Sequence, residues 1–129
     1  FQKELAERIV GKFKTTKYGR LSILTNYNLK IIKKFSVSPT CFFPVPKVDS
    51  SVLFFKPSKN TFFKIKNLEN LEKITNILFS NKRKMINKNI KKVLSENQLN
   101  LIKNLNFSSR PSDLQPDIYY KITELFEKN

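Results

Sequence analysis

The sequence contains no histidine, one cysteine and two glycines, and each scarcity excludes a class of site. Without histidine, neither a zinc site nor a Ser-His catalytic pair can form within this chain. Cys41 has no partner for an internal disulfide, which fits a reducing compartment. Gly11 and Gly19 stand alone, so the chain has neither a G-x-G-x-x-G loop nor a Walker-type loop to cradle a nucleotide cofactor.

Long apolar runs and targeting signals are also missing. No segment approaches the ~18 consecutive apolar residues of a membrane span. The first residues, FQKELAER, do not contain the apolar core of a signal peptide. We therefore expect a soluble, cytoplasmic protein.

Acidic residues are scarce beside basic ones: 10 Asp and Glu stand against 25 Lys and Arg, which gives a net charge of +15. Such an excess favours a polyanionic partner, such as nucleic acid or an anionic membrane surface. The alternative is compositional, because the chain is rich in Lys, Asn and Ile, the residues that an A/T-rich genome favours. The apolar content, 40% of residues, is typical of a globular protein with a core.

The apolar pattern of the first part of the chain changes from helical to extended. Residues 3–13 and 21–27 carry apolar side chains three or four positions apart, which predicts two short helices. In residues 29–37 the alternation predicts a half-buried strand with the odd-numbered residues on one side. Residues 48–55 are apolar on both faces and predict a second strand. We expect an antiparallel pair, with the intervening loop projecting past its end.

From Ser58 onward the pattern becomes helical. Residues 57–67 have the composition of a linker, and helices are expected at 68–80, 82–94, 96–105 and 116–127. In the last of these, Pro116 occupies the first helical position, where its missing amide costs no hydrogen bond.

The segment NKRKMINKNIKKVL, residues 81–94, is the most basic feature of the sequence. On a helix its cations and its apolar residues would lie on two faces: Lys84, Lys88, Lys91 and Lys92 against Ile86, Ile90, Val93 and Leu94. An acid-free row of cations can match successive phosphates of a nucleic acid. Arg83 adds a planar fork that suits phosphate. The alternative is an ordinary solvated helix face.

The stretch CFFPVPKVDSSVLFF, residues 41–55, begins with a stiff aromatic loop. Pro44 and Pro46 fix their own backbone and push the preceding residues toward extended geometry, so a polyproline-like segment is expected. Phe42 and Phe43 are adjacent, so in extended geometry their rings point to opposite sides and only one can face the core. The other can stack on a base pulled from its helix, although core packing is the alternative for both.

Four segments, taken in order, resemble the carboxyl-terminal half of one family: FQKELAERI, YGRLSILTNY, FFPVPKVDSSV and LFSNKRKMINKNIKKVL. They are similar to the small-subunit ribosomal RNA adenine N6,N6-dimethyltransferases (KsgA-like). The closing SSRPSDLQPDIYYKITELF resembles the last helix of that family, so the resemblance covers nearly all 129 residues. The large-subunit enzymes of the macrolide-resistance type share F-x-P-x-P and are an alternative, but V-D-S and YGRLS favour the small-subunit family.

The resemblance implies an α/β fold in two parts. Residues 1–57 would be the carboxyl-terminal part of a Rossmann-like class I methyltransferase domain, namely helices and the final antiparallel strand pair. Residues 58–129 would be a small all-α domain that binds ribosomal RNA. The family's S-adenosylmethionine site and its Asn-Leu-Pro-Tyr motif lie upstream of the matched region. The chain would then be an inactive fragment whose cofactor is bound by a missing amino-terminal part.

The resemblance also implies roles for individual residues. Phe42 holds the first position of F-x-P-x-P and would stack on the target adenine, with Pro44 and Pro46 as loop support. Phe43 falls on the variable position and is expected to be structural. Lys82, Arg83 and Lys84 match a basic cluster of the family that is implicated in RNA contact. Lys88 and Lys91, on the cationic face of residues 81–94, are also expected to contact RNA. No metal site is expected.

The full-length enzyme would transfer methyl groups from S-adenosylmethionine to two adjacent adenosines near the 3′ end of small-subunit ribosomal RNA, as a step in ribosome biogenesis. It would act as a monomer on a precursor of the small subunit, with no membrane partner. Two alternatives stay open for this chain. One is a stand-alone, non-catalytic RNA-binding or ribosome-assembly module, and the other is an inert product of gene decay or of an incomplete gene model.

Overall fold

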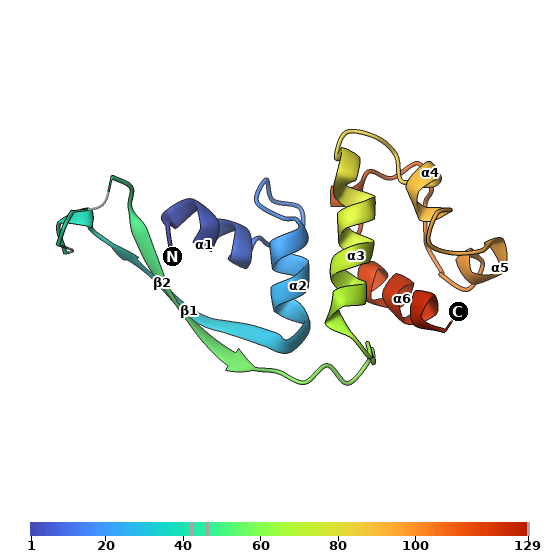
Figure 1. Ribbon diagram of the computed structural model, residues 1–129, viewed down its shortest axis with the longest axis horizontal. Helices are drawn as coiled ribbons and strands as arrows, with labels where there is room; N and C mark the ends of the chain where they lie inside the picture. Colours follow the sequence, from blue (N-terminus) through green and yellow to red (C-terminus); the bar gives the residue numbers. More distant parts are fainter. Residues whose placement is uncertain (42, 46, 129) are drawn as a thin grey trace. The chain divides into compact units, whose positions relative to one another are not determined.

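The computed structural model describes residues 1–41, 43–45 and 47–128 (Figure 1). Contacts divide the chain into two compact units, Phe1–Lys59 and Asn60–Asn129, called here the first unit and the second unit. Both strands lie in the first unit, and the elements of the second unit are helical. Within the described ranges, no helix has the length and apolar character needed to cross a membrane.

The first unit begins with the two helices that the sequence predicts, α1 (Lys3–Val10) and α2 (Arg20–Asn28). The first of them is shorter than expected. The chain leaves α1 at Gly11, where the backbone closely approaches the segment that precedes α2. A Cβ on Gly11 would lie 2.5 Å from the carbonyl oxygen of Lys17, so only glycine allows this approach.

The strands β1 (Leu29–Val37) and β2 (Ser50–Pro57) form the expected antiparallel pair. Val37 lies opposite Ser50 at one end of the sheet. Residues 38–49, called here the proline-rich loop, join these two residues. The loop therefore projects past that end, as the sequence predicts.

The sheet is irregular between Ile31 and Lys33, where Ile32 is skipped in the pairing with β2. Because side chains alternate along a strand, one extra residue moves every later side chain to the opposite face. Phe35 therefore lies on the face opposite to Ile31. The prediction that a single alternation runs through the whole strand was wrong, since that pattern assumes regular pairing throughout.

The two faces of the sheet differ in burial. The covered face contributes to a small core of Ala6, Ile9 and Leu53, with Val10, Ile31 and Phe55 packed against it. On the other face lie Phe35, Val52 and Phe54, which are 40%, 42% and 49% exposed. The rings of Phe35 and Phe54 meet edge to face, with 5.6 Å between their centroids. We call this second face, defined by these three residues, the open face of the sheet.

The second unit is centred on two longer helices, α3 (Leu68–Leu78) and α6 (Pro116–Glu127), which pack together (Figure 1). Shorter helical segments connect them: η2 (Phe79–Asn81), α4 (Asn87–Ile90), α5 (Glu96–Leu99) and η3 (Pro111–Asp113). Side chains of α3 and α6 with no exposed surface include Leu71, Ile74, Leu78, Tyr119 and Ile122. The buried side chains of these two helices thus form the core of the unit.

The segment before α3 is held against the end of α6. The carboxylate of Glu127 accepts hydrogen bonds from the amides of Lys66 (2.8 Å) and Asn67 (2.9 Å) and from the side chain of Asn70 (2.7 Å). Partial burial raises the pKa of Glu127, but these hydrogen bonds and the charge of Lys66 outweigh it, so the pKa lies below its ordinary value. Part of the predicted linker is therefore fixed to the second unit.

The basic segment does not form the continuous helix expected for residues 82–94. A turn follows η2, and α4 spans only Asn87–Ile90. The amide of Ile86 donates to the carbonyl oxygen of Ser109 (2.9 Å) instead of to a carbonyl one helical turn back. A tertiary hydrogen bond thus interrupts the helix. The apolar residues are nonetheless buried as predicted: Ile86, Ile90, Val93 and Leu94.

The helix expected at residues 96–105 is limited to α5. Ser95 caps its start, because the Ser95 hydroxyl accepts from the Gln98 amide (3.3 Å) and the Gln98 side chain accepts from the Ser95 amide (3.1 Å). Turns follow α5, and Asn104 has a φ of 64°, in the left-handed region that a continuing helix excludes.

Candidate nucleic-acid interface

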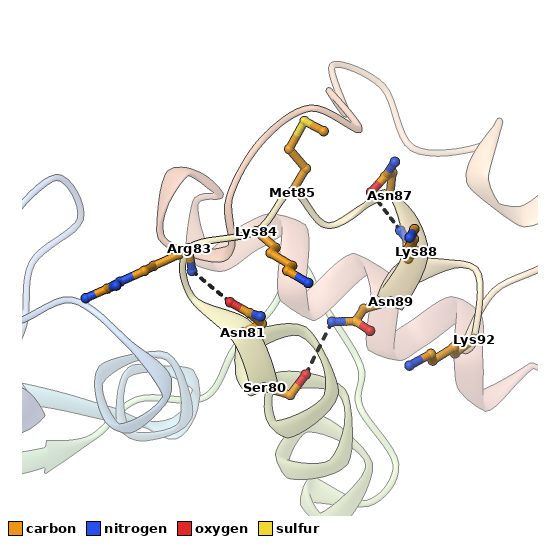
Figure 2. A pocket seen from close by; sticks show the side chains of 9 residues that line it. All are labelled: Ser80, Asn81, Arg83, Lys84, Met85, Asn87, Lys88, Asn89 and Lys92. Atoms are coloured by element: carbon orange, nitrogen blue, oxygen red, sulfur yellow. Dashed lines mark hydrogen bonds between the residues drawn. The ribbon is translucent and has the colours of Figure 1, made fainter.

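A hollow of about 720 Å³ opens on the second unit between η2 and α4 (Figure 2). It is lined by Ser80, Asn81, Arg83, Lys84, Met85, Asn87, Lys88, Asn89 and Lys92. The lining combines cations, asparagine amides and one thioether, without a carboxylate. We call it the basic hollow.

The interruption of the expected helix creates the basic hollow. Because the chain turns between η2 and α4, residues that would have formed one row now stand on two walls. Asn89 Nδ2, on the α4 wall, donates to Ser80 Oγ on the η2 wall at 3.3 Å, and this hydrogen bond joins the walls (Figure 2). A flat row of charge becomes a concave site.

Buried isoleucines fix the α4 wall in place. Ile86 and Ile90 are 1% and 0% exposed, and the Ile90 amide donates to the Ile86 carbonyl oxygen at 2.9 Å. With these two side chains in the core, the polar residues between them are turned outward. The alternation of apolar and polar residues in the sequence therefore determines which side chains line the hollow.

The positive charge of the basic hollow is not offset within the protein. The cations of its lining are Arg83, Lys84, Lys88 and Lys92, and no ion pair of the described residues includes any of them. Nor does an acidic residue line the hollow. A bound polyanion would thus meet cations without a competing carboxylate, and each phosphate contact would release condensed counterions.

The structure brings together some of the residues predicted to contact RNA and leaves others apart. Arg83, Lys84 and Lys88 line the basic hollow. Lys82 and Lys91 are exposed but do not line it. Figure 2 shows Lys84 directed toward the other lining side chains and Arg83 directed away from them. Contact between these five residues and RNA stays a prediction.

The helical pattern of the sequence did not indicate the polar neutral residues of the lining, which are Ser80, Asn81, Asn87 and Asn89. The available signal was the spacing of the asparagines in NKRKMINKN, because asparagine side chains bond nearby amides and favour turns over helix. Asn81 Oδ1 accepts from the Arg83 amide (3.3 Å), and Asn87 Oδ1 accepts from the Lys88 amide (2.9 Å). These bonds shape the turn that the helical pattern did not predict.

The proline-rich loop of the first unit carries the other predicted site. Phe42 and Pro46, assigned to base stacking and loop support, lie outside the described residues. Pro44 is exposed, and the Phe43–Pro44 peptide bond is cis. The chain bends at both residues instead of continuing as the expected polyproline-like segment. The side chain of Phe43 is 100% exposed, and its structural role stays a prediction. In the loop between β1 and β2, no described residue of the first unit covers this ring.

A second hollow, of about 490 Å³, lies beside α1 and differs in its charge. Lys17 Nζ lies 3.8 Å from Glu4 Oε1 and 3.6 Å from Glu7 Oε2. Lys17 thus already has carboxylate partners, and Glu4, Glu7 and Asp49 also line this hollow, so it is a weaker candidate for an anion. The described residues contain no group of three or more His, Cys, Asp or Glu that could hold a metal ion.

Comparison with known proteins identifies the family. A family model described as ribosomal RNA adenine dimethylase matches residues 1–128. The chain is 44% identical over 128 residues to ribosomal RNA small subunit methyltransferase A of Pelagibacter ubique. It is 36% identical over 124 residues to the protein of the same name from Malacoplasma penetrans. These alignments cover 98% and 94% of this chain, but 48% and 45% of the two relatives.

A solved structure extends the likeness to three dimensions. The crystal structure of a dimethyladenosine transferase from Plasmodium falciparum matches with a TM-score of 0.73 and 27% identity, over 99% of this chain and 55% of that chain. The chain thus spans about half the length of the relatives that it matches. The resemblance drawn from its motifs is confirmed, and the chain belongs to the ribosomal RNA adenine dimethylase family.

Proposed function

We propose that this chain is the carboxyl-terminal part of an enzyme that dimethylates two adjacent adenosines near the 3′ end of small-subunit ribosomal RNA. The observation that carries the proposal is the family match over residues 1–128, with curated relatives named for the small subunit. Those names favour the small-subunit function over the macrolide-resistance type. The family uses S-adenosylmethionine as methyl donor. The reaction would serve ribosome biogenesis.

The two units suit different parts of such an enzyme. We assign residues 1–57 to the carboxyl-terminal part of a Rossmann-like methyltransferase domain and residues 58–129 to a helical domain that binds ribosomal RNA. The strand pair and its open face support the first assignment, because a sheet in this class is normally covered on both faces. The basic hollow supports the second.

We assign no site for S-adenosylmethionine to the residues of this chain. Its two glycines are isolated in the sequence, and neither hollow is lined by a glycine-rich loop that could cradle a nucleotide. We therefore assign the cofactor site to the part of the full-length enzyme outside this sequence.

The proline-rich loop would hold the target base. Adenine N6 is a weak nucleophile, because its lone pair is delocalised into the ring, so the orientation of the base decides much of the rate. Phe42 would stack on the base, and Pro44 and Pro46 would restrict the loop that carries it. Stacking of this kind is worth about 1–3 kcal/mol per base.

The second unit would grip the RNA through its cations. We assign RNA contact to Lys82, Arg83, Lys84, Lys88 and Lys91. Their contribution would be independent of sequence and dependent on salt, since it comes from neutralised phosphates. Selection of the methylated adenosines and the chemistry would then depend on the first unit and on the rest of the enzyme.

The direct test is methyl transfer by the full-length protein that contains this chain. The protein would be incubated with S-adenosylmethionine and with ribosomal subunits that lack adenine dimethylation. Mass spectrometry of nuclease digests would report N6,N6-dimethyladenosine. We expect two such residues near the 3′ end of small-subunit RNA and none in large-subunit RNA.

Each other outcome of this test selects one of the alternatives. Methylation confined to large-subunit RNA would support an enzyme of the macrolide-resistance type. Salt-dependent binding to the small subunit without methyl transfer would support a non-catalytic assembly module. Neither binding nor methyl transfer would favour a decayed gene product.

A further inference from the structure

The basic hollow contains groups that phosphate binding does not require. Phosphate oxygens only accept hydrogen bonds, and the cations of the lining suffice for them. The lining also includes the carboxamides of Asn81, Asn87 and Asn89, which both donate and accept. Donor and acceptor groups side by side match the edge of a nucleobase.

The orientation of the Asn89 amide follows from its neighbour. The Ser80 hydroxyl donates its proton to the Ile77 carbonyl oxygen at 2.8 Å. Its oxygen can then only accept from Asn89, which places Nδ2 against Ser80 at 3.3 Å and turns Oδ1 away from it. Among the described residues, Oδ1 has no hydrogen-bond partner, and Nδ2 retains a second proton. Asn89 thus presents a fixed acceptor and donor in the lining of the hollow.

The other two amides add donors. Asn81 and Asn87 use their oxygens to accept from the amides of Arg83 and Lys88. Their Nδ2 groups make no hydrogen bond within the described part of the chain. Both side chains are held by these backbone bonds, so little conformational entropy is lost when they bind a ligand.

The hollow also offers apolar surface and sufficient room. Met85 lines it and is 48% exposed, although the next residue, Ile86, is only 1% exposed. A methionine side chain adapts to the flat face of a ring. The volume, about 720 Å³, lies within the range of small-molecule sites. A site for bare backbone phosphates needs neither the depth nor the thioether.

We propose that the basic hollow binds one unpaired nucleotide of the ribosomal RNA, extruded from its helix, and that this nucleotide is distinct from the methylated adenosines. Its base lies among the asparagine amides, with Asn89 as the orienting contact. Its flanking phosphates lie on Lys84 and Lys88. This proposal rests on the proposed function, because it takes ribosomal RNA as the ligand, and it adds a second point at which the enzyme reads an unpaired base.

The test uses the 129-residue chain and three synthetic RNA hairpins that differ at one position of the stem. The first is fully paired, the second carries one unpaired adenosine, and the third carries an abasic residue in its place. Fluorescence anisotropy gives the affinities over a range of salt concentrations. We expect the chain to bind the adenosine bulge about ten-fold more tightly than the paired hairpin, as one well-placed base contact would give. The abasic bulge should bind like the paired hairpin.

Protein variants locate the contact. Asn89→Ala should abolish the preference for the bulge while affinity for the paired hairpin stays within about two-fold, because phosphate contacts carry that binding. Asn100→Ala, at an exposed asparagine that does not line the hollow, serves as the matched control and should keep the preference. Circular dichroism would confirm that both variants are folded, and the abasic hairpin tests the base contact without any change to the protein.

The unfavourable outcomes are distinct from one another. Equal affinity for all three hairpins, with normal salt dependence, would overturn the nucleotide site and leave the proposed function intact. If the chain preferred both bulged hairpins equally over the paired one, it would recognise the shape of the RNA and not the base. That result would also overturn the site. A preference kept in Asn89→Ala would overturn the site, and its loss in Phe42→Ala would then place the base at the proline-rich loop instead. No salt-dependent binding to any hairpin would count against the proposed RNA-binding function itself.

Discussion

The two units of the chain cover their apolar side chains to different degrees. In the second unit, Leu71 and Ile122 have no exposed surface, and α3 and α6 close around a common core. In the first unit, the open face of the sheet leaves Phe35 and Phe54 nearly half exposed. An uncovered face of this kind fits our proposal that the first unit is part of a larger domain, whereas the second unit completes its own core.

The units also differ in how they pair charge. In the first unit, Arg8 lies 3.2 Å from Glu4, and Lys17 reaches both Glu4 and Glu7. In the second unit, the cations of the basic hollow have no carboxylate partner within the described residues. Net charge is therefore a poor guide to where a polyanion binds, and the absence of nearby acids is a better one.

Truncation of buried side chains should give the largest difference in stability between the two units. Leu71→Ala removes a fully buried side chain and should lower the free energy of unfolding of the second unit by about 2–5 kcal/mol. Leu53→Ala, in the small core of the first unit, should cost less, because fewer groups surround the cavity. Val52→Ala on the open face should change stability by less than about 0.5 kcal/mol.

Native-state hydrogen exchange would assign each loss to its unit, and urea unfolding would give its size. If Leu53→Ala cost as much as Leu71→Ala, the first unit would have a core as complete as that of the second. If Val52→Ala were strongly destabilising, the open face would be covered in solution, for example by a second copy of the chain.

The sequence predicted local features well and tertiary interruptions poorly. The helix at 116–127 was correct, because proline at its start and an apolar stripe are both local signals. The strand at 29–37 was correct in extent, but its faces exchange where Ile32 is skipped in the pairing. Periodicity alone does not reveal such a bulge, because it depends on the partner strand.

The same limit applies to the candidate interface. The cations of the basic segment were evident from the sequence, and its buried isoleucines were predicted correctly. The hollow was not predicted, because the helix is interrupted by a hydrogen bond from Ile86 to Ser109, a residue remote in sequence. The asparagines of this segment line a concave site only because that hydrogen bond interrupts the helix.

Charge removal from the hollow should have the next largest effect. Arg83→Ala with Lys84→Ala should weaken binding to an RNA fragment from the 3′ end of the small subunit by about ten-fold and flatten its salt dependence by about 1–2 in slope. Arg8→Ala with Lys17→Ala removes the same charge from the first unit, where the cations are already paired. That variant should keep the wild-type slope.

A second matched pair tests the hollow against its surroundings. Lys82→Ala with Lys91→Ala removes the same charge from exposed positions that do not line the hollow, and we expect a smaller change in slope. Filter binding at several salt concentrations would measure all three variants. Equal slopes for the two second-unit pairs would extend the RNA contact beyond the hollow, and an equal loss in the first-unit variant would show that net charge alone decides affinity.

Removal of one carboxylate from each unit should give the smallest difference, measured as the free energy of unfolding. Glu127→Gln weakens the hydrogen bonds that hold the segment before α3 and should lower the free energy of unfolding by roughly 1 kcal/mol at neutral pH. Glu4→Gln in the first unit weakens two ion pairs at the surface, with Arg8 and with Lys17, and should cost less than about 0.5 kcal/mol. Urea unfolding at neutral pH would measure both.

The pH dependence gives the sharper distinction. The folded protein holds the pKa of Glu127 below its ordinary value of 4.5, because backbone and side-chain donors favour the carboxylate. The stabilisation is therefore complete above the pKa of the unfolded chain and is lost as the pH falls through the lower pKa of the folded state. The stability difference between wild type and Glu127→Gln should be constant near neutral pH and shrink on acidification. A difference that grew on acidification would mean that Glu127 is held in its protonated form, and that the second unit is not anchored by this carboxylate.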